Sequence, residues 1–202
     1  MHQDYPHAYA RILWEKGWGS ALGMADENDY FASIPKAPSD TEVENSRFPL
    51  LVLVDGRLPL RSACRFAGID FRGNRETFIA SALRAAEDPP VYWMRCQDGK
   101  SALNRNRDDV LREFVAGECV LTAIEGVCLA AQYPDIMHAN YDLELAGSVC
   151  HLGEADHFAN LIWENPRAEC INLPDQPVGL SLQYAVECRF PSPCTGLPTR
   201  LR

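Results

Sequence analysis

The sequence predicts an α+β (or α/β) fold in which one mixed β-sheet is flanked by helices within a single domain. In the first half of the chain, apolar runs typical of strands alternate with helical patterns, whereas candidate strands cluster in the second half. The length of 202 residues suffices to bury the core of one domain. We therefore expect a helical or irregular arm at 1–46 and a mixed body at 47–202 that ends in an irregular tail.

The predicted arm is rich in aromatic residues before it turns polar. Its pattern favours short helices at 5–16 and 26–33, and the polar segment 33–46, which contains two prolines, is typical of a surface loop. The arm is expected to pack on the body. Alternatively, its aromatic residues form an interface between two copies of the chain, and these are Tyr5, Tyr9, Trp14 and Trp18.

In the first half of the body, the sequence predicts alternating strands and helices. The run RFPLLVLVDG at 47–56 is typical of a strand buried on both faces, and VYWMRC at 91–96 is a second strand. Helical spacing predicts three helices, which are 58–68 with Gly68 as its cap, 75–88 before two prolines, and 107–116 before Gly117. The buried stripe of the third helix would be Val110, Leu111, Phe114 and Val115.

The second half of the body favours strands. Alternation in YDLELAGS predicts a strand over 141–148 with one wet face, so that Asp142 and Glu144 would point to water. The segments 157–165 and 168–173 are close enough to form a hairpin, and 180–190 predicts a last strand. Prolines beyond 190 favour an irregular end.

Charge and composition exclude several classes of function. A formal net charge of -9 and a pI near 5.0 make the surface repel phosphate backbones and anionic headgroups, so we expect no nucleic-acid and no membrane partner. We find no long apolar run and no signal-peptide pattern. The eight cysteines are therefore expected to be reduced thiols in a bacterial cytoplasm.

The stretch LTAIEGVCLAAQYP at 121–134 allows two interpretations, the start of a helix or a reactive site. Thr122 and Glu125 have the spacing of a capping box, which begins a helix, and Cys128 would then face the core. The alternative is a reactive Cys128 thiol with a distant base, for which His138 is the nearest histidine in sequence. Gly126 lies where a hydrophobic residue usually packs, which indicates a close approach to the backbone or a bound ligand.

A second cluster offers two thiols and two imidazoles within one hairpin, which are the ligand types of a tetrahedral zinc site. Its spacing lacks a Cys-x-x-Cys anchor, and neighbouring strand residues point to opposite faces, so ordinary strand and loop residues are the alternative. The candidate ligands are Cys150, His151, His157 and Cys170. We find no phosphate-binding loop, dinucleotide fingerprint or nucleophile elbow, and we expect no cofactor and no catalytic residues.

The chain resembles a family of uncharacterised bacterial proteins, a domain of unknown function. The resemblance covers 47–175 and rests on a Leu-Thr, Glu-Gly helix start, a strand ending in Gly-Ser and a strand containing Trp. The matching residues are Leu121, Thr122, Glu125, Gly126, Pro134, Leu143, Leu145, Gly147, Ser148 and Trp163. The family's Gly, Trp and Asn-rich segment is replaced here by ECINLPDQPVGLS. The resemblance implies a shared fold and no activity, cofactor or site.

Three hypotheses of function follow. The first is a non-enzymatic cytoplasmic domain that binds another protein or a small ligand, because no motif supplies a nucleophile, a base and an oxyanion donor together. The second is a small enzyme or zinc protein that uses the cysteines and histidines named above. The third is a structural subunit of a homo-oligomer that associates through its aromatic N-terminal segment.

Overall fold

The computed structural model has an α+β fold with two sheets. It describes residues 5–38, 47–72, 79–80, 88–137, 141–152, 155–164, 179–185 and 194–201. Among them, no helix is both long and apolar enough to cross a membrane. The predicted fold class is confirmed, although the single mixed sheet that we expected is divided into two.

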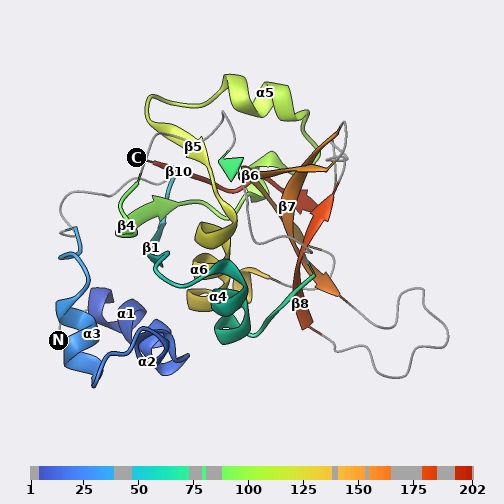
Figure 1. The fold of residues 1–202 in the computed structure, drawn as a ribbon. Coiled ribbons are helices and arrows are strands. Elements are labelled where there is room, and N and C mark those ends of the chain that lie inside the picture. The colour runs from blue at the N-terminus through green and yellow to red at the C-terminus, as the bar shows by residue number, and fades with distance from the viewer. Residues whose placement is uncertain are drawn as a thin grey trace.

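The first sheet contains four antiparallel strands in the order β1-β4-β10-β5. Their bounds are β1 Leu50–Asp55, β4 Val91–Cys96, β5 Glu118–Val120 and β10 Thr199–Leu201. The apolar run of β1 is buried along almost its whole length, as its sequence predicts. The C-terminal strand β10 lies between β4 and β5, so the last residues of the chain complete this sheet (Figure 1).

The second sheet is mixed, with the order β2-β8-β7-β6-β3 and with β9 paired to β6. The β2–β8 and β6–β9 pairs are parallel and the others antiparallel. Its strands are β2 Ile69–Phe71, β3 Ile79–Ala80, β6 Asp142–Leu152, β7 Ala155–Glu164, β8 Gly179–Ala185 and β9 Thr195–Gly196. A register shift between Leu145 and Val149 interrupts the β6–β7 pairing, which bends β6.

Helix α6 (Ala123–Gln132) lies between the two sheets and contacts β1 on one side and β6 and β7 on the other (Figure 1). Nearly every residue of this helix is buried, which fits its apolar sequence on all sides. Helix α4 (Leu60–Ala67) packs beside it and ends at Gly68, whose φ of 77° is readily adopted by glycine. The predicted helix at 58–68 is thus confirmed.

The N-terminal segment forms three short helices against β1 and α6, namely α1 Tyr5–Glu15, α2 Trp18–Ala21 and α3 Glu27–Ala32. The expected helices at 5–16 and 26–33 are confirmed. Asp26 caps α3 by accepting a hydrogen bond from the Asp29 N–H at 3.0 Å. Trp18 is fully buried in the chain's own core, Trp14 packs against that core, and the ring of Tyr9 contacts Tyr133. An interface between copies through these aromatic residues stays a prediction.

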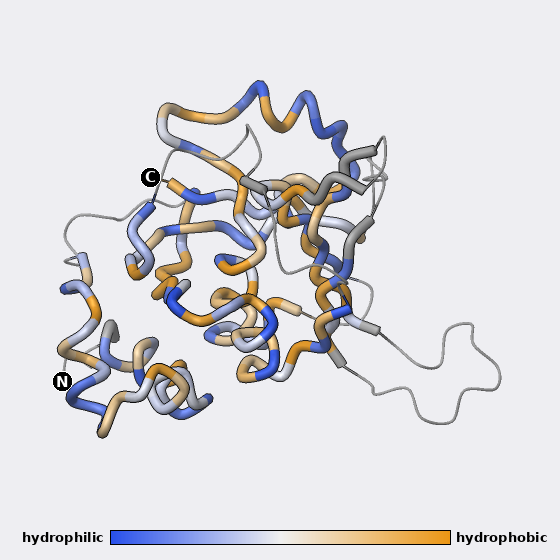
Figure 2. The backbone as a smooth tube through the Cα atoms, in the orientation of Figure 1, coloured by the Kyte–Doolittle hydropathy of each residue, from blue (hydrophilic) through white to orange (hydrophobic). Residues whose placement is uncertain are grey.

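Two predicted helices differ from the structure. Within the predicted helix 75–88, Ile79–Ala80 form strand β3 instead, paired with Val149 and Ser148 of β6, because pairing with a neighbouring strand overrides local helix propensity. Helix α5 is Arg107–Arg112 and ends well before the predicted residue 116. Val115 is 44% exposed rather than part of a buried stripe. Figure 2 shows hydrophilic residues along much of α5.

The strand predictions are confirmed for 91–96 and in part for 141–148, 157–165 and 180–190. The wet face expected of 141–148 is wrong, because Glu144 is fully buried and pairs with Arg107 at 3.2 Å. The hairpin partner 168–173 lies outside the described residues. The tail, expected to be irregular, contains β9 and β10, because the first sheet offers β10 two strand edges to pair with.

Candidate functional site

The predicted zinc ligands are only partly described. The backbone of Cys150 on β6 pairs with that of His157 on β7, so the sheet brings this pair of candidates into register. His151 pairs instead with Asp156, and Cys170 lies outside the described residues. Within the described part of the chain, no group of three or more His, Cys, Asp or Glu side chains could hold a metal ion. A zinc site at these residues stays an untested prediction.

Most of the described thiols lie inside the protein, where burial makes them unreactive. Cys64, Cys96 and Cys128 are buried free thiols, and Cys119 is buried as well. Burial raises the pKa of Cys64 and of Cys128 to about 12 and raises the pKa of Cys96 further. At neutral pH these thiols are protonated, which is the inert state. Cys128 thus faces the core as the capping-box reading predicts, and its alternative partner His138 lies outside the described residues.

The capping box at the start of α6 is present in full. The Thr122 hydroxyl accepts a hydrogen bond from the Glu125 N–H at 3.4 Å, and the Glu125 carboxylate accepts one from the Thr122 N–H at 2.5 Å. Both orphan N–H groups at the helix start are thereby satisfied. The hydroxyl and carboxylate that looked reactive in the sequence therefore begin a helix.

Residues that carry the family resemblance meet at one junction between α6 and the bend in β6. The Gly147 N–H donates to the Leu121 carbonyl at 2.9 Å, and the Ala123 N–H donates to the Ser148 hydroxyl at 2.8 Å. A Cβ on Gly126 would lie 2.4 Å from a methyl carbon of Leu145. Gly126 therefore allows α6 to pack closely on β6, which explains the missing hydrophobic partner at that position.

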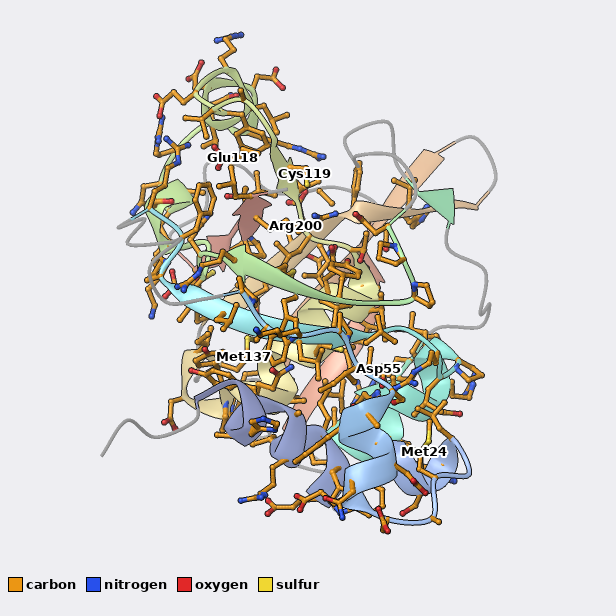
Figure 3. All side chains as sticks on the ribbon, turned by 90° about the vertical axis from the view of Figure 1, so that its left-hand side faces the viewer. Met24, Asp55, Glu118, Cys119, Met137 and Arg200 are labelled. Carbon is orange, nitrogen blue, oxygen red and sulfur yellow. The ribbon has the colours of Figure 1, made fainter. Side chains whose placement is uncertain are left out.

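Glu125 has a second role that the sequence does not reveal. Its other oxygen accepts a hydrogen bond from the Tyr92 hydroxyl at 2.5 Å and forms an ion pair with Nε of Arg200 at 2.6 Å. Arg200 also pairs with Asp88, and the side chains of Glu125 and Arg200 are 0% and 2% exposed. Figure 3 places Arg200 in the interior of the molecule. We call Tyr92, Glu125, Arg200 and Asp88 the buried charge cluster, and it anchors β10 to α6.

A second buried carboxylate fixes the N-terminal helices to the body. Asp55, at the end of β1, is fully buried and forms an ion pair with Arg57 at 2.6 Å. It also accepts a hydrogen bond from the Tyr30 hydroxyl at 3.0 Å, and the Trp18 indole N–H donates to its carbonyl at 3.3 Å. Arg57 in turn donates to the Ser33 hydroxyl at 2.9 Å. These partners are structural, because they tie α2 and α3 to β1.

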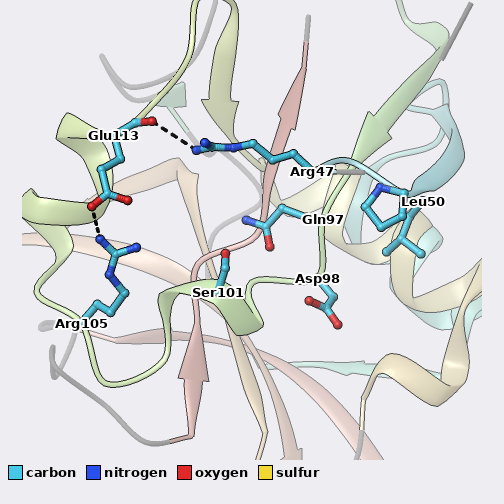
Figure 4. Close-up of a pocket in the computed structure, with 8 residues that line it drawn as sticks. Arg47, Leu50, Gln97, Asp98, Ser101, Arg105 and Glu113 are labelled. Carbon is cyan, nitrogen blue, oxygen red and sulfur yellow. Dashed lines mark hydrogen bonds and ion pairs between the residues drawn. The ribbon is translucent and has the colours of Figure 1, made fainter. Parts of the chain in front are cut away.

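The surface carries a polar pocket with a volume of about 430 Å³, beside the start of β1 and the turn after β4. Figure 4 shows side chains from three separated segments converging on it. We call it the arginine pocket, and its lining residues are Arg47, Pro49, Leu50, Gln97, Asp98, Ser101, Arg105 and Glu113. Pro49 and Leu50 supply the apolar lining, whereas the other lining residues offer charges, an amide and a hydroxyl.

The arginine pocket is held in shape by the end of the chain. The Gln97 amide donates to the Leu197 carbonyl at 3.1 Å and to the Thr199 hydroxyl at 3.0 Å. The Thr199 hydroxyl donates to Glu118 at 2.6 Å, and Glu118 binds Arg47 at 2.7 Å. Insertion of β10 therefore positions both Gln97 and Arg47. Sequence reasoning missed this pocket, because its residues come from segments that no local pattern links.

A second opening, also about 430 Å³, lies between the N-terminal helices and β4. It is mainly apolar, with Phe31, Ile34, Pro35 and Trp93 among its lining residues. The Trp93 indole N–H donates to the Pro35 carbonyl at 2.8 Å, so this polar group is already satisfied within the chain. The opening offers a ligand fewer hydrogen-bonding groups than the arginine pocket does.

Comparisons with protein-family models, with curated proteins and with solved structures found no match to this chain. The resemblance to a family of uncharacterised bacterial proteins therefore stays an expectation, although several of its residues, among them Leu121, Gly126, Gly147 and Ser148, form the junction between α6 and β6.

Proposed function

We propose that this protein is a non-enzymatic cytoplasmic binding domain that takes a small polar molecule into the arginine pocket. The observation that carries the proposal is the contrast between this pocket and the interior. The pocket gathers two guanidinium groups, carboxylates and the Ser101 hydroxyl at the surface, where a ligand can reach them. The Cys64 and Cys128 thiols are instead buried and protonated.

The size and lining of the pocket support a small ligand rather than a macromolecule. A volume of about 430 Å³ lies within the usual range for ligand pockets, about 300–1,000 Å³. Specificity in such pockets comes from a few placed polar groups beside an apolar wall. Here Pro49 and Leu50 supply the apolar contact, and Arg105 and Ser101 supply hydrogen-bonding groups.

The free thiols are the basis for placing the protein in a reducing compartment. Among the cysteines whose side chains are described, Cys64, Cys96 and Cys128 are free thiols. Free thiols are usual in the cytoplasm and rarer in exported proteins. The alternative of a zinc protein at Cys150, His151, His157 and Cys170 is decided by elemental analysis of untagged protein, in which one equivalent of zinc would favour it.

The proposal is tested by filling the pocket. A library of small polar fragments is screened by saturation-transfer NMR against the wild-type protein and against Ser101→Trp, since Ser101 is exposed and lines the pocket. The matched control is Ser20→Trp, which adds the same ring at an exposed position on α2. Fragments should bind the wild type and the control but not Ser101→Trp. An identical set of fragments bound by all three proteins would contradict the proposal.

A further inference from the structure

Glu113 lies between the two arginines of the pocket (Figure 4). Its carboxylate forms an ion pair with Arg105, and its main-chain carbonyl accepts a hydrogen bond from Arg47 at 3.2 Å. Arg105 first, and Arg47 to a smaller extent, lower the pKa of the Glu113 carboxyl. The position of the Glu113 carboxylate is therefore one that favours a negative charge.

The two arginines are held with unequal strength. Arg47 is itself 44% exposed, but its partner at 2.7 Å, Glu118, is only 2% exposed and also accepts hydrogen bonds from the Val115 N–H and the Thr199 hydroxyl. Arg105 and Glu113 are 35% and 58% exposed. An exposed ion pair contributes little to stability, so water or another anion displaces it easily. Arg47 is thus held in place by a buried carboxylate, whereas the side chains of Arg105 and Glu113 can separate.

The charges around the pocket balance only while Glu113 is in place. Among the described residues that line the pocket or pair with its lining, the cations are Arg47, Lys100 and Arg105, and the anions are Asp98, Glu113 and Glu118. Asp98 is compensated by Lys100 at 2.8 Å, and Glu118 by Arg47. When the Glu113 carboxylate leaves, Arg105 keeps the weaker attraction of Asp109, which is itself paired with Arg112 at 2.5 Å. One ligand carboxylate would restore the balance.

We infer that the ligand of the arginine pocket is a small monocarboxylate, which displaces the Glu113 carboxylate from Arg105. In the empty pocket the Glu113 carboxylate neutralises Arg105, and it competes with the ligand carboxylate for this guanidinium. A carboxylate matches the planar fork of a guanidinium, which gives this pairing its geometric specificity. The inference rests on the proposed function of the pocket and adds the chemical class of its ligand.

The test uses lactate as the probe and its neutral amide, lactamide, as the matched control ligand. Both are titrated into ¹⁵N-labelled protein, and dissociation constants are read from chemical-shift changes. The variants are Glu113→Ala, Arg105→Met and the control Glu27→Ala, which removes a carboxylate from another exposed ion pair, with Arg11 in the N-terminal helices. Glu113→Ala keeps the main-chain carbonyl that binds Arg47, and the amide spectrum of each variant reports whether it folds.

We expect Glu113→Ala to bind lactate about three- to tenfold more tightly than the wild type, since the competing ion pair is lost. Arg105→Met should bind lactate at least tenfold more weakly, and Glu27→Ala should match the wild type. Lactamide affinity should not rise in Glu113→Ala. An unchanged lactate affinity in Glu113→Ala, with weaker binding in Arg105→Met, would overturn the role of Glu113 and leave the pocket as a ligand site. Equal affinity for lactate and lactamide would overturn the monocarboxylate class, whereas the failure of the whole proposal would appear in the Ser101→Trp screen.

Discussion

The buried charge cluster and the arginine pocket use the same pair of chemical groups for opposite purposes. In each, an arginine meets a glutamate, but Arg200 and Glu125 are almost fully buried, whereas Arg105 and Glu113 are exposed to water. A buried pair cannot be separated without leaving a charge in the interior, so it locks β10 to α6. An exposed pair separates at little cost, so it can give way to a ligand. Burial, rather than residue type, decides which pair is structural.

The largest expected effect comes from removing the buried arginine. Arg200→Met leaves Glu125 without its cation, and we expect the free energy of unfolding to fall by about 3–5 kcal/mol. Urea denaturation followed by circular dichroism measures the change. The double variant Arg200→Met/Glu125→Gln should be more stable than the single one, because glutamine keeps the helix cap without the buried charge. A loss below about 1 kcal/mol in Arg200→Met would show that the cluster does not hold β10 in place.

An intermediate effect is expected at the junction of α6 and β6. A Cβ on Gly147 would lie 2.8 Å from the Leu121 carbonyl oxygen, whereas the three atoms nearest to one on Gly126 belong to the side chain of Leu145. Since backbone yields less than a side chain, Gly147→Ala should lose up to about 3 kcal/mol of stability. Gly126→Ala should lose less, because alanine also gains about 1 kcal/mol of helix propensity. The reverse order in urea denaturation would contradict this account of the two glycines.

The smallest effect is expected at the exposed pair. Arg105→Met should leave the midpoint of thermal unfolding close to that of the wild type, and added salt should reduce the difference further. Differential scanning fluorimetry at low and high salt measures both, with Arg112→Met as a control for another exposed pair, to Asp109. A fall in the midpoint well beyond that of Arg112→Met would mean that the Arg105–Glu113 pair is structural, and the pocket would then not open as inferred.

The sequence by itself determined the elements whose signals are local. The Thr122 and Glu125 pair predicts the start of α6, Gly68 predicts the end of α4, and the apolar run at 50–55 predicts a buried strand, all as observed. Each of these signals acts within a few residues, through backbone hydrogen bonds or through the period of side-chain burial. Local chemistry of this kind is readable without knowledge of the fold.

Only the tertiary structure decided which charges are buried and where the site lies. Alternation in 141–148 correctly predicts a strand, but the burial of Glu144 depends on Arg107, which comes from α5. The insertion of β10 between β4 and β5 brings Arg200 to Glu125, and Arg47 meets Glu113 across 66 positions of sequence. Side chains so far apart in the chain meet only when sheets and helices pack, and no local pattern encodes that meeting. The pairing of β10 with β4 and β5 makes the C-terminal segment an inner strand of the first sheet, and it also positions Gln97 and Arg47 in the arginine pocket.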